Sequence, residues 1–106
     1  MNDALLDRYP RLGRLFAAYV NQDWDLHGET PYGAVRAYVS ASKAAERREA
    51  VEEIVRLLAE FRGEKALDAA LGDLLCGYAP SADGTTAKAF LGRVKRVLAA
   101  PPRKRS

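Results

Sequence analysis

The chain has 106 residues, of which 48% are hydrophobic and 29% are charged, so it is long and apolar enough for one packed domain, and wholesale disorder is excluded. A single cysteine excludes an intramolecular disulfide framework, and a single histidine excludes multi-histidine metal motifs. The net charge of +3 comes from residues 101–106, because residues 1–100 contain equal numbers of acidic and basic residues.

The first part of the chain predicts two helices. Directly after Pro10, apolar residues recur at the spacing of one buried helical face: Leu12, Leu15, Phe16, Tyr19 and Val20. A second helix is expected to begin at Pro31, because Thr30 suits an N-cap and proline suits the first helical position. Its apolar side carries Ala34, Val35, Tyr38 and Val39. The tyrosines on or beside these faces, Tyr9, Tyr19 and Tyr38, are expected in the core rather than in a binding cage.

The middle of the chain predicts a long helix followed by a leucine-rich one. Ser42 can cap the long helix and Gly63 is expected to end it. Its apolar stripe is Val51, Ile54, Val55, Leu58 and Phe61. The next helix repeats the same spacing with Ala66, Leu67, Ala70, Leu71, Leu74 and Leu75, and Gly77 is expected to end it.

A loop rich in glycine and proline over residues 77–84 separates the last helix from the others. Thr85 or Thr86 caps this helix, whose inward positions are Ala87, Phe90, Leu91, Val94, Val97 and Leu98. Prolines 101 and 102 end it, and residues 101–106 are expected to form a disordered basic tail. No segment alternates as a strand does. The sequence therefore predicts an all-α fold, a single small bundle of about five amphipathic helices in one domain over residues 1–100.

Neither a membrane segment nor a signal peptide is predicted. No stretch approaches the ~18 consecutive apolar residues of a membrane-spanning helix. The first residues include early acids and lack the apolar core of a signal peptide. The expected location is therefore the cytoplasm.

No catalytic, cofactor or metal site is predicted. Cys76 follows a leucine-rich stretch, where a buried and inert thiol is the ordinary case. His27 lies in a connection, where a capping or solvated role is favoured over catalysis. No phosphate loop, GxGxxG, HExxH or EF-hand spacing occurs. We therefore expect a protein that is not an enzyme.

The segment from Asn21 to Glu29 holds the sole tryptophan, Trp24, between acidic residues. In one interpretation its acids meet a basic partner, with Trp24 as an aromatic anchor. In the other, Trp24 and Leu26 pin the connection onto the core and the acids face solvent. The long helix adds further glutamates interleaved with arginines. The candidate partner-binding residues are Asp23, Asp25, Glu29, Glu46, Glu49 and Glu53.

The order of short motifs resembles a known family over about residues 8–98. The motifs are Tyr9-Pro10-x-Leu12, Leu15-Phe16-x-x-Tyr19, Gln22-Asp23-Trp24, Thr30-Pro31 with Ala34-Val35, Cys76-Gly77-Tyr78-x-Pro80, and Gly84 before the last helix. In this order they are similar to the small all-helical CdiI-type immunity proteins of bacterial contact-dependent growth inhibition systems. The resemblance implies a non-catalytic cytosolic protein that binds and blocks the C-terminal toxin domain of a cognate CdiA effector, often a nuclease.

The charge distribution leaves a second function open. Residues 21–73 hold 11 acidic and 7 basic residues, whereas residues 74–100 hold one acidic and 4 basic residues. The acidic middle suits an inhibitor of a nuclease. The basic C-terminal end, with Lys88, Arg93, Lys95 and Arg96, leaves a small nucleic-acid-associated or regulatory protein as the alternative, although it lacks interleaved aromatics. The leading expectation is an immunity protein that is monomeric when free and binds neither membranes nor nucleic acid.

Overall fold

Six α-helices and two short 3-10 helices form the fold in a computed structural model, which describes residues 3–21, 23–27 and 30–100 without the side chains of Asp3 and His27. The elements are α1 (Asp3–Arg8), α2 (Pro10–Ala18), η1 (Trp24–His27), α3 (Pro31–Ala41), α4 (Ala44–Glu60), α5 (Glu64–Asp73), η2 (Pro80–Asp83) and α6 (Ala87–Ala99). The described residues contain no strand, which confirms the predicted all-α fold and its five longer helices. The six-residue α1 was not predicted, since it is too short to show a hydrophobic period.

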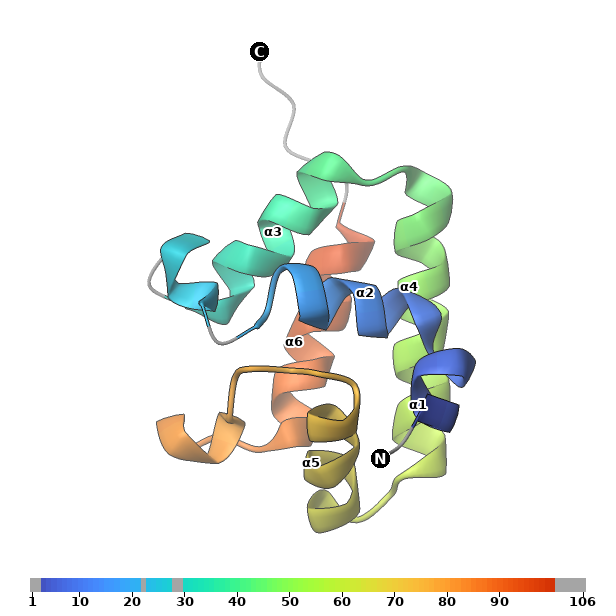
Figure 1. Cartoon of the computed structure of the whole chain (residues 1–106), viewed down its shortest axis with the longest axis vertical. Coiled ribbons are helices and arrows are strands. Elements are labelled where there is room, and N and C mark those ends of the chain that lie inside the picture. The colour runs from blue at the N-terminus through green and yellow to red at the C-terminus, as the bar shows by residue number, and fades with distance from the viewer. Residues whose placement is uncertain (1–2, 22, 28–29, 101–106) are drawn as a thin grey trace.

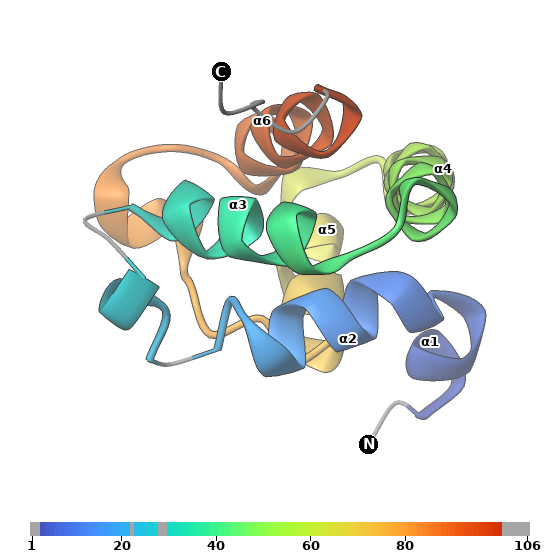
Figure 2. The ribbon, with the colours of Figure 1, turned by 90° about the horizontal axis from the view of Figure 1, so that it is seen from above.

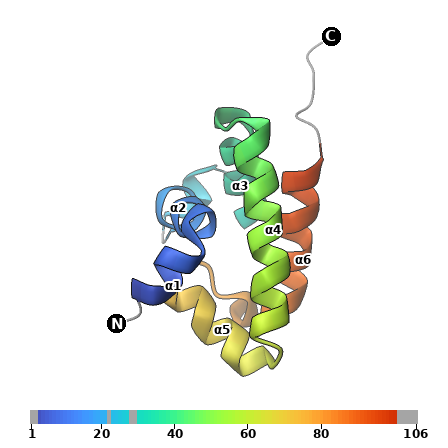
Figure 3. The same cartoon turned by 90° about the vertical axis from the view of Figure 1, so that its right-hand side faces the viewer.

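The helices surround one core. α4 and α6 run side by side in opposite directions, and α5 joins the end of α4 to η2 and α6 (Figures 1 and 3). Seen from above, α1 and α2 lie on the side opposite α6, with α3 between them and α6 (Figure 2). α2 packs on α4, α3 packs on α6 and on η1, and α5 packs on α6 and α1.

Aromatic rings fill the centre of this core around Phe90. Its ring lies 6.5 Å from Phe16, 5.9 Å from Tyr32 and 5.0 Å from Tyr78 between centroids. These separations are typical of favourable ring packing. The prediction that three tyrosines belong to the core is confirmed, since Tyr9 and Tyr38 are buried and Tyr19 packs against the core.

The buried face of α4 differs from the predicted stripe. Ala50, Ile54 and Leu57 are fully buried, whereas Val55 is 50% exposed. Val51, Leu58 and Phe61 pack at the edge of the core. The face is rotated because it includes a buried glutamate, Glu53, which hydrophobic periodicity assigns to the solvent side.

Several predicted helix ends lie elsewhere. Ser42 closes α3 rather than opening α4, because its hydroxyl donates to the Tyr38 carbonyl at 2.7 Å. Lys43 is the N-cap of α4, and its backbone N–H donates to the Glu46 carboxylate at 2.9 Å. Gly63 does not end α4, which closes at Phe61, but is the N-cap of α5.

The start of α6 confirms one of the two predicted caps and adds a second. The Thr86 hydroxyl accepts the Ala89 N–H at 3.0 Å. The Glu64 carboxylate, from the start of α5, accepts the Ala87 N–H at 2.6 Å. A negative charge at a helix N-terminus is favourable, so Glu64 joins α5 to α6 electrostatically.

The end of α5 is a Schellman turn without glycine. Leu75 adopts the left-handed conformation, with φ of 70°. The N–H of Leu75 donates to the Gly72 carbonyl at 3.0 Å, and the N–H of Cys76 donates to the Leu71 carbonyl at 3.0 Å. The predicted stop at Gly77 is therefore wrong, because a strained leucine ends the helix earlier.

Candidate functional site

Asn21 organises the acidic segment that follows α2. Its side-chain amide donates to the Ala17 carbonyl at 3.0 Å, and its side-chain oxygen accepts the Asp23 N–H at 2.9 Å. This turn starts η1 and leaves Asp23 and Asp25 exposed. Neither of these two carboxylates forms a hydrogen bond or an ion pair within the described part of the chain. They are therefore open to a positively charged partner.

Trp24 holds η1 against the loop after α5. Its ring meets Tyr78 edge-on, with 5.5 Å between centroids, and it packs at the rim of the core. The Gly77 N–H donates to the Val20 carbonyl at 2.7 Å and fixes the same loop to the end of α2. The structural interpretation of Trp24 is thus supported. For Leu26 it is wrong, because that side chain is 82% exposed and pins nothing.

Glu46 and Glu49 lie on α4 and are occupied by Arg11. The guanidinium of Arg11 contacts Glu49 at 2.7 Å and Glu46 at 3.6 Å. The backbone N–H of Lys43, aided by Arg11, lowers the pKa of Glu46. These two carboxylates are partly neutralised before any partner arrives.

Glu53 is not available to a partner. It is 5% exposed, and its carboxylate accepts the backbone N–H groups of Leu12 at 2.9 Å and Arg11 at 3.2 Å. Burial raises its pKa, and these two backbone hydrogen bonds act in the opposite direction. Glu53 caps α2 from α4, so its predicted partner-binding role is corrected to a structural one.

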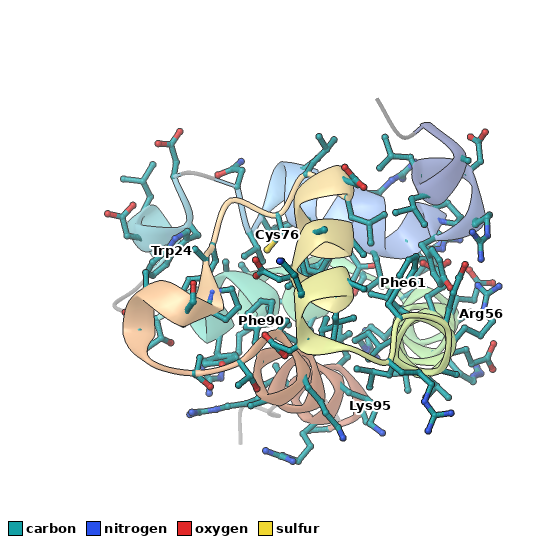
Figure 4. All side chains as sticks on the ribbon, turned by 90° about the horizontal axis from the view of Figure 1, so that it is seen from below. Trp24, Arg56, Phe61, Cys76, Phe90 and Lys95 are labelled. Atoms are coloured by element: carbon teal, nitrogen blue, oxygen red, sulfur yellow. The ribbon has the colours of Figure 1, made fainter. Side chains whose placement is uncertain are left out.

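The predicted acids do not form one surface. η1 and α4 lie on opposite sides of the molecule, with α2 and α3 between them (Figure 1). Seen from below, Trp24 of η1 and Arg56 of α4 lie at opposite ends (Figure 4). Glu29 lies outside the described residues. The structure thus separates an unpaired pair, Asp23 and Asp25, from the ion-paired Glu46 and Glu49.

The four basic residues of the stretch 74–100 lie on α6. Lys88, Arg93 and Arg96 are exposed, and Lys95 is half-buried. Arg93 stacks over the Tyr32 ring at 4.4 Å, a cation–π contact that ties it to α3. The predicted basic tail, residues 101–106, lies outside the described residues.

Chemistry-bearing groups are few in the described part of the chain. Burial raises the pKa of the half-buried Cys76 thiol to about 11. The described residues contain no cluster of three potential metal ligands. Within them, every helix is also too short or too polar to span a bilayer. His27, the other residue considered for catalysis, has no described side chain.

The sequence did not predict that two leucine side chains are exposed. In one of the two interpretations of the segment, Leu26 pins it onto the core, and Leu75 was expected on a buried helical face, yet Leu26 is 82% and Leu75 is 51% exposed. The acids on both sides of Leu26 are the one local signal of its exposure. Nothing in the sequence signals Leu75, since it completes an apolar helical repeat.

Comparison with known proteins identifies the family. The sequence profile of the CdiI immunity protein family matches residues 8–98. A chain in the crystal structure of a CdiA-CT/CdiI complex from Y. kristensenii 33638 is 27% identical to this one. It superimposes with a TM-score of 0.79 over 90% of this chain and 97% of that chain. No curated protein matches the sequence. Because the family match covers most of its length, the chain belongs to the CdiI immunity protein family.

Proposed function

We propose that this chain is an immunity protein that binds the C-terminal toxin domain of a cognate CdiA effector in the cytoplasm and blocks it. It acts by occupying the toxin rather than by catalysis, and it is a monomer when free. The observation that carries the proposal is the likeness of 90% of the chain to a chain of a CdiA-CT/CdiI complex. The family match over residues 8–98 supports the same function.

We propose further that the toxin is a nuclease. A nuclease cleft must be positively charged to hold phosphates, and an inhibitor that covers it gains from presenting carboxylates. Asp23 and Asp25 support this, since they are exposed and unpaired among the described residues. Glu29 follows them in the chain and is a third candidate from the sequence. Glu46 and Glu49 are weaker contributors because Arg11 already contacts both.

Co-expression tests the immunity function. The toxin used is the C-terminal domain of the CdiA effector that we expect to be encoded immediately upstream of this chain's gene. Cells that make both proteins should grow, and the purified pair should elute as a one-to-one complex. Growth arrest in the presence of this chain, together with no complex, would refute the immunity function.

Two further measurements test the nuclease and its contact surface. The purified toxin should degrade RNA or DNA, and this chain should stop the degradation; a toxin that kills without cutting nucleic acid would refute the nuclease assignment. Asp23→Lys with Asp25→Lys should weaken binding more than tenfold, whereas reversal of Lys88, Lys95 and Arg96 to glutamate should change it little. The opposite pattern would move the interface to α6.

The nucleic-acid alternative has its own measurement. The chain alone should not bind RNA or DNA at about 150 mM salt, where an interaction carried by a few basic residues collapses. Tight binding of the free chain under those conditions would favour the alternative over the immunity function.

A further inference from the structure

Two of the three large exposed apolar side chains among the described residues, Leu26 and Leu75, lie in adjoining segments, and the third is Val55 on α4. Leu26 is two residues from Trp24, and Leu75 is three residues from Tyr78, whose rings are in contact at 5.5 Å. A chain spans at most ~3.3–3.6 Å per residue, so both leucines lie close to that contact. One partner of a standard interface buries ~800 Å², an area that spans several adjoining segments.

Leu75 has a backbone conformation that is unfavourable for leucine, and no contact among the described residues of the free fold requires a leucine there. With φ of 70°, Leu75 occupies the left-handed position of a Schellman turn, where glycine is the usual residue. A leucine there is strained. Because its side chain is 51% exposed, burial of that side chain offsets little of the strain. Strain of this kind gathers where a side chain serves a purpose beyond the fold.

The two segments that carry the leucines are acidic in sequence. The segments that meet at the Trp24–Tyr78 contact, residues 15–35 and 66–87, contain no lysine or arginine. They carry six acidic residues: Asp23, Asp25, Glu29, Asp68, Asp73 and Asp83. Figure 4 shows Trp24 and Cys76, the neighbour of Leu75, on adjacent segments away from Arg56. A partner that covers this surface must supply both apolar contact and positive charge.

We propose that Leu26 and Leu75 are the apolar anchors of the surface that binds the toxin domain, which presents an apolar patch ringed by lysine or arginine. This rests on the immunity function proposed above and adds the residues that supply binding energy. A second copy of this chain fits the surface poorly, because a two-fold contact would bring the acids of both copies together. Fully covered apolar anchors inside a charged rim are the usual source of affinity in such interfaces.

Truncation of each leucine tests the proposal against a matched control. The variants are Leu26→Ala, Leu75→Gly and, for the third exposed apolar side chain, Val55→Ala. Binding to the upstream-encoded CdiA C-terminal domain is measured by calorimetry, and melting of each free variant is followed by circular dichroism. Leu26→Ala and Leu75→Gly should each weaken binding at least tenfold, and Val55→Ala less than threefold. Leu75→Gly should melt at or above the wild-type temperature, because glycine relieves the left-handed strain.

The binding results separate failure of the two anchors from failure of the immunity function. If the wild type binds and the Leu26→Ala and Leu75→Gly variants bind within threefold of it, the anchors are refuted while the immunity function stands. If Val55→Ala alone weakens binding, the interface lies on α4. If the wild type does not bind the toxin, the proposed function fails and the anchors fail with it. Should the free chain dimerise, and should Leu26→Ala abolish the dimer, the occupant is a second copy and the proposal is wrong. If the Leu75→Gly variant does not fold, the binding of the Leu26→Ala variant alone tests the proposal.

Discussion

Glu53 should be the polar side chain on which the fold depends most. Its carboxylate is 5% exposed and accepts two backbone N–H groups at the start of α2, from Leu12 at 2.9 Å and from Arg11 at 3.2 Å. These donors belong to the first turn of α2 and have no partner within their own helix. Glu53→Gln keeps one carbonyl oxygen as an acceptor but turns an amide NH₂ toward the other donor. Glu53→Ala leaves both donors without an acceptor and opens a cavity.

The expected cost follows from those contacts. A hydrogen bond to a charged acceptor contributes about 1.5–3 kcal/mol, and a favourable charge at a partly buried helix end adds up to ~2 kcal/mol. The neutral amide avoids the desolvation of a buried carboxylate, so the net loss for Glu53→Gln is about 2 kcal/mol. Glu53→Ala should lose roughly 3–5 kcal/mol, because two buried N–H groups are then unsatisfied. A loss of 2 kcal/mol corresponds to a melting temperature lower by roughly 8–15 °C in a domain of this size.

Urea unfolding followed by circular dichroism measures both losses, and Glu52→Gln is the control. Glu52 is the preceding residue of α4 and is exposed, so its amide variant should change the free energy of unfolding by less than ~0.5 kcal/mol. An unchanged denaturant slope would show that the variants still unfold in one step. If Glu53→Ala unfolds within ~0.5 kcal/mol of the wild type, the carboxylate is not the cap that we describe.

Three further expectations concern strain, acid stability and the thiol. Gly84 ends η2 with φ of 73°, and a Cβ added there would meet open space. Gly84→Ala should therefore lower the free energy of unfolding in urea by about 1 kcal/mol, from backbone strain alone. An unchanged free energy of unfolding would refute the left-handed assignment. Hydrogen bonds from Arg8 and Tyr9 lower the pKa of Glu60, so its contribution to stability is present above its ordinary pKa of 4.5 and is lost as pH falls through the lowered native pKa. Glu60→Gln should therefore lose less stability than the wild type as the pH falls below the ordinary pKa of 4.5, and an equal loss in both would contradict the ion pair. The thiolate is the reactive form of cysteine, and the pKa of Cys76 is about 11 against the ordinary 9.0. Cys76 should therefore react with a thiol reagent ~100-fold more slowly in the folded protein than in urea. Equal rates would show that the thiol is not buried.

Short-range sequence patterns specify the helices and most of the core. Periodic apolar residues and local caps are short-range signals, and the structure keeps them: Pro31 opens α3, and Thr86 caps α6. Phe16 and Phe90 come from helices at opposite ends of the chain, yet each was predicted inside from its own helix alone. The motif order also sufficed for the family, because it extends along nearly the whole chain.

Packing between the helices sets which polar and apolar residues depart from these patterns. Glu53 is buried because the open end of another helix, 41 residues away in the sequence, supplies donors for it, and no local pattern encodes that end. Leu75 is exposed and left-handed at the turn where the chain leaves α5, two residues before Gly77 donates to Val20, so an apolar position of the helical repeat lies in solvent. Asp23 and Asp25 were separated from the glutamates of α4 by the packing of α2 and α3 between them. Periodicity reports which residues favour burial, but burial is shared between helices, and the assembled helices decide which charge finds a partner and which leucine is left without one.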